Sequence, residues 1–273
     1  MKEDVALPRR IFEGRENIGF SLSHFAGYES PNMYGDEASH IHDFTEIYVN
    51  ISGETEFIVG DNVYSVGHGD AVISPADTFH HCVLKSSGVH ERFFLWLDAG
   101  RFPVGSNFMR GGAVVLPSDK RLRLIDDFYA LARERDSAIL SNAAVSAFFD
   151  ILATLEAAGG NIAAPSKLPP LLSVITQYIN EFYGGDCSER ALCERFFVSR
   201  STLCRIFRKN LGVTPSRYVE TRRLSEAKRL LEKGESVQNV CFSCGFGNYS
   251  HFIALFKRRF GVTPYRYGKA ERR

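Results

Sequence analysis

Hydrophobic and polar positions follow two different periods along the chain, and the change falls near residue 115. Before that point, apolar residues cluster in short runs rich in β-branched and aromatic side chains, separated by turn sequences such as GHGD at 67–70. Short runs of this kind at close spacing predict the strands of a sandwich or barrel. The runs read EIYVNIS, ETEFIVG, NVYSVG, DAVISP, HCVLKS and ERFFLWLD.

Farther along, the apolar residues recur at helical spacing. Residues 118–158 predict two helices, residues 159–169 have the Gly, Pro and Ser content of a linker, and residues 170–273 return to a helical pattern. The predicted fold class is therefore multidomain α+β. A β-barrel over residues 1–117 precedes the helical segment, and an all-α domain follows the linker.

The predicted helices of residues 118–158 carry more apolar surface than one thin layer over a barrel needs. We therefore predict that this segment mediates a homodimer. The apolar residues at helical spacing are Leu122, Ile125, Phe128, Leu131, Phe148, Ile151, Leu152 and Leu155.

A basic, aromatic dodecamer occurs twice in the C-terminal part. FRKNLGVTPSRY at 207–218 and FKRRFGVTPYRY at 256–267 share seven identities in register. Such a repeat indicates one supersecondary unit used twice. Each dodecamer closes a segment that predicts two short helices joined by a tight turn, which is the pattern of a helix-turn-helix.

Capping residues place the helices of both motifs. Ser188 and Ser199 are suited to cap the two helices of the first motif, and Ser236 and Asn248 those of the second. Between the motifs a helix of about 17 residues would span roughly 25 Å. A connecting helix of that length can hold two recognition helices roughly 34 Å apart, about one turn of the DNA duplex. A plain helical bundle explains the apolar spacing but not the duplicated Arg and Lys.

The net charge of +1 is unevenly divided. Residues 1–166 contain 13 Lys/Arg and 23 Asp/Glu, a net charge of −10, whereas residues 167–273 contain 20 and 9, a net charge of +11. The basic part favours a polyanion partner, and a merely solvated basic surface is the alternative. No apolar run reaches the length of a membrane helix, and the polar N-terminus does not resemble a signal peptide. We expect a cytoplasmic protein whose six Cys are reduced.

Residues 170–268 resemble the AraC/XylS family of bacterial transcription regulators, most specifically in GFGNYSHFIALFKRRFGVTPYRY. The resemblance implies a seven-helix domain that binds adjacent major grooves of double-stranded promoter DNA, with RNA polymerase as a further partner. Arg205 is the residue expected to recognise guanine. Ala254 stands where relatives often have Arg. The expected DNA-binding residues are Arg200, Ser201, Cys204, Arg205, Arg208, Tyr249, Ser250, His251 and Lys257.

Seven of the eight His lie before residue 91. HIHDFTEIYVNISG and GDAVISPADTFH resemble the two motifs of the cupin superfamily, although Asp77 stands where cupins commonly have Gly. His40, His42 and Glu46 share strand parity, which predicts one common face. The residues expected to contact an effector are His40, His42, Glu46, His80 and Trp96.

Three roles remain open for these side chains: hydrogen bonds to a small organic effector, ligation of Fe, Mn, Ni or Zn, or purely structural packing. We favour a transcription regulator, an activator that responds to a small molecule such as a carbohydrate, with no resident cofactor and no catalytic residues. The alternative is a metal-dependent cupin enzyme fused to a DNA-binding module.

Overall fold

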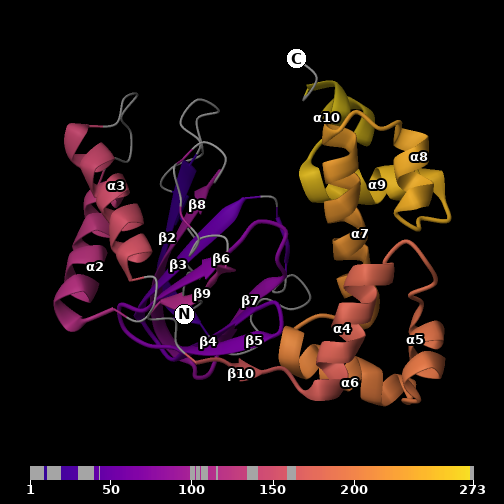
Figure 1. Cartoon of the computed structure of the whole chain (residues 1–273), viewed down its shortest axis with the longest axis horizontal. Coiled ribbons are helices and arrows are strands. Elements are labelled where there is room, and N and C mark those ends of the chain that lie inside the picture. The colour runs from indigo at the N-terminus through magenta and orange to yellow at the C-terminus, as the bar shows by residue number, and fades with distance from the viewer. Residues whose placement is uncertain are drawn as a thin grey trace, which may run out of the picture. The chain divides into compact units, whose positions relative to one another are not determined.

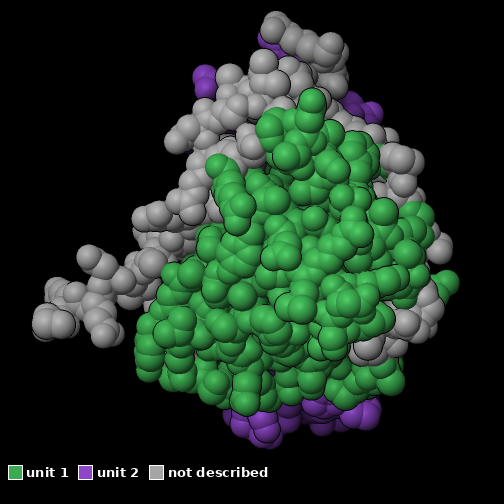
Figure 2. All heavy atoms as spheres, turned by 90° about the vertical axis from the view of Figure 1, so that its left-hand side faces the viewer, with its two compact units in different colours: residues 1–33, 44–167 green, residues 34–43, 168–273 purple. Residues whose placement is uncertain are grey.

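The computed structural model divides the chain into two compact units (Figure 2). The first, here called the β unit, comprises residues 1–33 and 44–167, and the second, the helical unit, comprises residues 34–43 and 168–273. The predicted limits of the barrel, the helical segment, the linker and the all-α domain stay predictions. The structure describes residues 9–10, 20–29, 40–42, 44–98, 102, 105, 110–114, 116–133, 141–158 and 164–270.

Two antiparallel sheets form the centre of the β unit (Figure 1). One has the strand order β1-β2-β8-β3-β6-β9 and the other β10-β5-β4-β7. The predicted β-rich architecture is thereby confirmed. The strands are β1 (Arg9–Arg10), β2 (Phe20–Glu29), β3 (Thr45–Ser52), β4 (Thr55–Val59), β5 (Asn62–Val66), β6 (Ala71–Ser74), β7 (His80–Leu84), β8 (Gly88–Leu97), β9 (Gly112–Val114) and β10 (Ser166–Lys167).

Strand alternation sends opposite sets of side chains to the two faces of the six-stranded sheet. On β3, Ile47 and Val49 are fully buried in a core that also contains the residues of two helices, α2 (Ser118–Ala132) and α3 (Asn142–Ala157). Tyr48 faces the other way and is buried among residues of the four-stranded sheet. The helices therefore cover one face of the sheet, and the second sheet covers the other (Figure 1).

The prediction that the apolar stripe of α2 and α3 forms a free dimer surface is wrong for most of its residues. Phe148 is 1% exposed and its ring stacks on Phe20 with centroids 4.0 Å apart. Of the eight predicted residues, only Leu122 is exposed. The reason is that the strands of the six-stranded sheet present apolar side chains to both faces, so one face needs a covering layer. Among described residues of the helical pair, the exposed large apolar side chains are Leu122, Val145 and Phe149.

The predicted linker contains a short strand. Ser166 and Lys167 pair with Val63 and Asn62 of β5, and the Ser166 hydroxyl donates to the carbonyl oxygen of Val63 at 3.2 Å. The linker therefore adds an edge strand to the β unit before the helical unit begins.

The helical unit is all-α from residue 170 onward, as predicted. No helix among the described residues is long and apolar enough to cross a membrane. The helices are α4 (Pro170–Phe182), α5 (Glu189–Phe196), α6 (Arg200–Leu211), α7 (Pro215–Glu232), α8 (Val237–Ser243), α9 (Tyr249–Phe260) and α10 (Pro264–Ala270).

Candidate DNA interface and sensor site

Two helix-turn-helix motifs are built from the pairs α5–α6 and α8–α9, here called HTH1 and HTH2. All four predicted caps are present. The hydroxyl oxygens of Ser188, Ser199 and Ser236 accept from backbone N–H groups at 3.2, 3.1 and 3.2 Å, and Asn248 Oδ1 accepts from the N–H of His251 at 2.9 Å. Each bond satisfies a donor that the first turn of a helix leaves open.

The two motifs differ at the turn between their helices. HTH2 uses Gly245 with φ +81°, whereas HTH1 uses Phe197 with φ 53°. A left-handed conformation costs a residue with a Cβ about 1–2 kcal/mol, and the Phe197 side chain is 95% exposed. The repeat therefore conserves the backbone path of the turn while its residue type changes.

The second helix of each motif has one buried and one open face. In α6, Leu203, Phe207 and Leu211 are buried, and in α9, Phe252, Leu255 and Phe256 are buried. The predicted DNA-binding residues lie away from these stripes. Exposed side chains are Arg200, Ser201, Arg205, Arg208, Tyr249, Ser250, His251 and Lys257, and Cys204 is partly exposed.

Arg200 and Arg205 differ in their surroundings. Arg200 Nε donates to Glu189 Oε2 at 2.6 Å, and this hydrogen bond holds the pKa of the Glu189 carboxyl below its ordinary value. Arg205 has no ion pair within the described part of the chain. Its guanidinium is therefore more available to a base edge than that of Arg200.

The six cysteines are all free. Burial raises the pKa of the Cys244 thiol to about 12 and that of Cys82 to about 11. Both groups are therefore neutral thiols at physiological pH, and neither has the thiolate character that metal binding or redox chemistry needs. The prediction that Cys241 packs as a small hydrophobe agrees with its complete burial in the core of HTH2.

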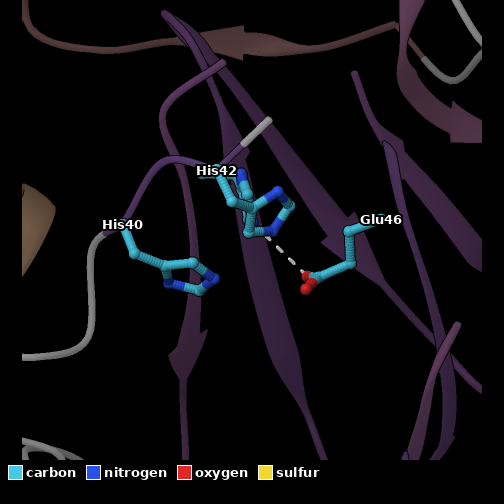
Figure 3. A group of neighbouring side chains, drawn as sticks. His40, His42 and Glu46 are labelled. Atoms are coloured by element: carbon cyan, nitrogen blue, oxygen red, sulfur yellow. Dashed lines mark ion pairs between the residues drawn. The ribbon is translucent and has the colours of Figure 1, made fainter. Parts of the chain in front are cut away.

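Four of the five predicted sensor residues gather in one cluster. Each of His40, His42, Glu46 and His80 offers a ligand atom, and these atoms all lie within 4.8 Å of one another. Figure 3 shows the side chains of His40, His42 and Glu46 converging. The fifth residue, Trp96, pairs with Glu46 on the adjacent strand and donates from Nε1 to Glu46 Oε2.

The predicted reason for this gathering was wrong. His40 and His42 do not share a strand with Glu46, because β3 begins only at Thr45; His40 forms an isolated β-bridge, and His42 has no regular secondary structure. Strand parity therefore does not orient them.

His80 faces Glu46 from the opposite sheet. Its Nδ1 lies 2.8 Å from the carbonyl oxygen of Thr78, so Nδ1 carries the proton and donates. Its Nε2 lies 3.5 Å from Glu46 Oε1. In the neutral tautomer a lone pair would face a carboxylate, and a proton or a cation between the two atoms relieves that repulsion. Both side chains are almost fully buried, which strengthens the interaction.

The turn that leads to His80 explains the departure at Asp77. The N–H of Thr78 donates to the carbonyl oxygen of Pro75 at 3.3 Å, and Asp77 has φ 58°. This is the left-handed conformation that glycine adopts without strain and that aspartate tolerates better than most residues. Asp77 therefore replaces the usual glycine without changing the turn.

Sequence reasoning missed two buried hydroxyls on the sheet face that carries Glu46. Ser74 pairs in register with Glu46 on β3, and Ser23 pairs with Phe94 on β8. Both side chains are buried, and neither hydroxyl oxygen has a hydrogen-bond partner among the described residues. The available signal for Ser74 was its position opposite Glu46 in the pairing of β6 with β3, which sends both side chains to the same face of the sheet.

Comparison with known families and proteins agrees with this geometry. A model of the helix-turn-helix domain matches residues 192–270, and a model of the cupin domain matches residues 33–96. Together the matches define a helix-turn-helix transcription regulator with a cupin domain. The chain is similar to regulators of the AraC/XylS type. This finding favours the regulator over the metal-dependent enzyme.

Individual relatives cover most of the chain. The HTH-type transcriptional activator RhaS of Escherichia fergusonii is 25% identical over 243 residues, covering 82% of this chain and 85% of that protein. RhaS of an Escherichia coli O139:H28 strain is 34% identical over 94 residues, 34% of each chain. Among solved structures, ToxT from Vibrio cholerae with a bound unsaturated fatty acid is 16% identical, with a TM-score of 0.41 over 94% of this chain and 97% of that chain.

Proposed function

We propose that this regulator binds promoter DNA through α6 and α9 together and activates transcription in response to a small molecule bound in the β unit. The observation that carries the proposal of DNA binding is that both recognition helices, α6 and α9, have the same kind of exposed face. Each buries three apolar residues and exposes polar and basic ones. A homodimer and contact with RNA polymerase complete the proposal. A protein that acts on promoter DNA works in the cytoplasm of a bacterial cell.

Arg205 and Lys257 have different roles in this proposal. Arg205→Ala is expected to cost about 1–3 kcal/mol at the operator and to relax base preference at one position, because a bidentate contact to guanine is lost. Lys257→Ala should weaken binding to all sequences alike, because it removes a phosphate contact. Titration of both variants against a selected operator and a random duplex measures the difference.

Arg190→Ala is a suitable control, because Arg190 pairs with Glu194 at 3.0 Å on the exposed side of α5 and is not a predicted DNA-binding residue. It should bind both duplexes like the wild type. Equal losses of Arg205→Ala on the operator and on random DNA would reduce Arg205 to a backbone contact.

The effector part of the proposal rests on the buried polar cluster of Glu46, His80 and Trp96. The carboxylate and imidazole can bind hydroxyl groups of an effector, and Ser23 and Ser74 add two buried hydroxyls without partners among the described residues. An aromatic wall with a few convergent polar groups is typical of small-molecule sites. Polar hydroxylated compounds, carbohydrates among them, are the ligand class that fits.

A divalent cation is a second candidate effector, favoured by the cluster that includes His40 and His42. Three imidazoles and one carboxylate suit Fe, Mn, Ni or Zn. The hydrogen bond from His80 Nδ1 to a backbone carbonyl orients Nε2 as the donor atom for a metal, an arrangement common among metal-binding histidines.

A thermal-unfolding screen of the full chain separates these candidates. A ligand that binds only the native state stabilises it by about 2.7 kcal/mol at 100 times its dissociation constant. The screen uses a set of sugars and polyols and, separately, Zn²⁺, Mn²⁺, Ni²⁺ and Fe²⁺. A response to a sugar that Ser74→Ala reduces supports the organic effector, whereas a response to a cation that His42→Ala removes supports the metal. If neither class raises the unfolding temperature, the effector site lies elsewhere.

A further inference from the structure

The turn that leads into HTH1 contacts HTH2 directly, beside the helix that connects the two motifs. The turn between α4 and α5, residues 183–187, meets the turn between α8 and α9, residues 244–248, and Arg223 of α7 lies against both. We call this place the Arg223 joint. It lies wholly within the helical unit, and no predicted DNA-binding residue belongs to it.

Arg223 joins the two turns with its guanidinium. Its Nε donates to the carbonyl oxygen of Tyr183 at 2.8 Å, and its Nη2 donates to that of Gly185 at 2.8 Å. The same guanidinium carbon lies 5.9 Å from the ring centroid of Phe246 in HTH2. A planar fork with fixed donor directions suits such a double contact, and lysine cannot reproduce it.

Two glycines allow the turns to approach. A Cβ on Gly184 would lie 2.7 Å from the carbonyl oxygen of Ser243. A Cβ on Gly245 would lie 2.8 Å from the carbonyl oxygen of Gly184 and 2.9 Å from Arg223 Nη2. Real Cβ atoms do not come this close to backbone oxygens, so any side chain at Gly184 would push the α4–α5 turn and HTH2 apart.

Neighbouring contacts hold α7 against the same turn. The Arg222 guanidinium lies 4.5 Å from the ring centroid of Tyr183. Glu226, which is 6% exposed, accepts hydrogen bonds from Arg222 at 3.4 Å and from Arg229 Nε at 3.1 Å. The α4–α5 turn is thus fixed to α7 on one side and to HTH2 on the other.

We infer that Arg223 is a positioning residue that fixes the rotation of HTH1 relative to HTH2 and so sets the spacing between the two DNA boxes that the protein accepts. A helix of 18 residues sets the distance between the motifs, and HTH2 shares a hydrophobic core with the C-terminal half of that helix. The Arg223 joint adds a second attachment, which ties the turn that leads into HTH1 to the turn of HTH2. Once one motif is bound to a duplex, a rigid connection holds the other motif close to its own box and so raises its effective concentration there.

The inference rests on the proposal that both motifs bind DNA, and its test distinguishes the two. The probe is a two-box duplex that the wild-type full chain selects from a randomised library. Its companions are a one-box duplex with the second box scrambled, and a duplex with two base pairs inserted between the boxes. The insertion rotates the second box by about 70° and moves it by about 7 Å.

For the wild type we expect the insertion to weaken binding about tenfold, because a rigid pair of motifs no longer fits. Arg223→Ala should weaken binding to the original two-box duplex about tenfold and leave binding to the one-box duplex within about twofold of the wild type. The insertion should weaken the binding of this variant much less than it weakens that of the wild type. Gly184→Ala should likewise lose affinity only on the two-box duplex.

Gly185→Ala is the matched control for Gly184→Ala. It adds the same methyl group to the next residue of the same turn, where the nearest atom would be the carbonyl oxygen of Phe182 at an ordinary 3.5 Å. It should behave like the wild type on all three duplexes. Arg223→Lys keeps the charge without the fork and should behave like Arg223→Ala.

Two results would overturn the inference. One is a spacing penalty in Arg223→Ala and Gly184→Ala as steep as in the wild type. The other is an equal loss on one-box and two-box duplexes, which would make Arg223 a residue of general stability or a phosphate contact. Wild-type affinity that is the same for one-box and two-box duplexes would instead contradict the proposal that both motifs bind.

Discussion

Replacing Phe148 with aspartate is expected to unfold the β unit. The Phe148 ring packs between Phe20 and Phe102, with centroids 4.0 and 4.9 Å away, and is 1% exposed. Removing a buried phenylalanine ring typically costs about 3–5 kcal/mol, and burying a carboxylate without a partner adds to that cost. The sum is comparable to the whole stability of an ordinary domain, about 5–15 kcal/mol. Denaturant unfolding followed by circular dichroism measures it.

The adjacent residue provides the control. Phe149 is 49% exposed on the same helix, so Phe149→Asp should keep the stability of the wild type within about 1 kcal/mol. With Leu122 and Val145, Phe149 forms the apolar surface that α2 and α3 leave open, and it is the place at which we propose dimerisation. Sedimentation of Phe149→Asp should therefore show a folded monomer. A stably folded dimer of Phe148→Asp would contradict the burial of Phe148 against Phe20 and Phe102. A Phe149→Asp variant that is still a dimer would show that the dimer interface lies elsewhere.

The contrast between Phe148 and Phe149 shows what periodicity can and cannot predict. The helical spacing of the apolar residues correctly predicted α2 and α3 and the face that they bury. It could not say what that face packs against, because the same stripe serves a dimer or a sheet. Only the three-dimensional sheet, with apolar side chains such as Ile47 and Phe93 on its outer face, decides the question.

Local signals were enough for the helix-turn-helix motifs. Caps such as Ser199 and Asn248 act within three residues of their own position, so the sequence contains the whole interaction. The Arg223 joint had no such signal. Its partner Tyr183 lies 40 residues away, and nothing in the sequence around Arg223 distinguishes it from the other arginines of the same helix.

The histidine cluster falls between these cases. The motif resemblance named four side chains that the structure brings together. It supplied no geometry, and the strand parity used to orient His40 and His42 does not apply, because neither residue lies on β3. Glu46 and His80 come together because two strands of different sheets face each other, a contact over 34 residues that no local pattern encodes.

Glu29→Ala is expected to destabilise the β unit by about 3–5 kcal/mol, because it leaves a buried guanidinium without its counter-charge. Glu29 is fully buried and Arg92 is 5% exposed. Arg92 Nη2 donates to Glu29 Oε1 at 2.9 Å, and a second bond joins Nη1 to Oε2. Burial alone would lower the pKa of Arg92. The hydrogen bonds and charge of Glu29, together with Cys82 and Tyr48, outweigh burial and raise that pKa above its ordinary value.

Two comparisons make this prediction specific to burial. Glu56→Ala breaks an ion pair of similar length, 3.0 Å to Lys85, whose side chains are 33% and 46% exposed, and should cost no more than about 1 kcal/mol. The double variant Glu29→Leu/Arg92→Met should regain most of the stability, because an apolar pair of similar volume leaves no charge behind. Denaturant unfolding of all three variants decides the matter. A double variant no more stable than Glu29→Ala would mean that the loss comes from packing around Phe25, whose ring lies 4.3 Å from the guanidinium carbon, rather than from the stranded charge.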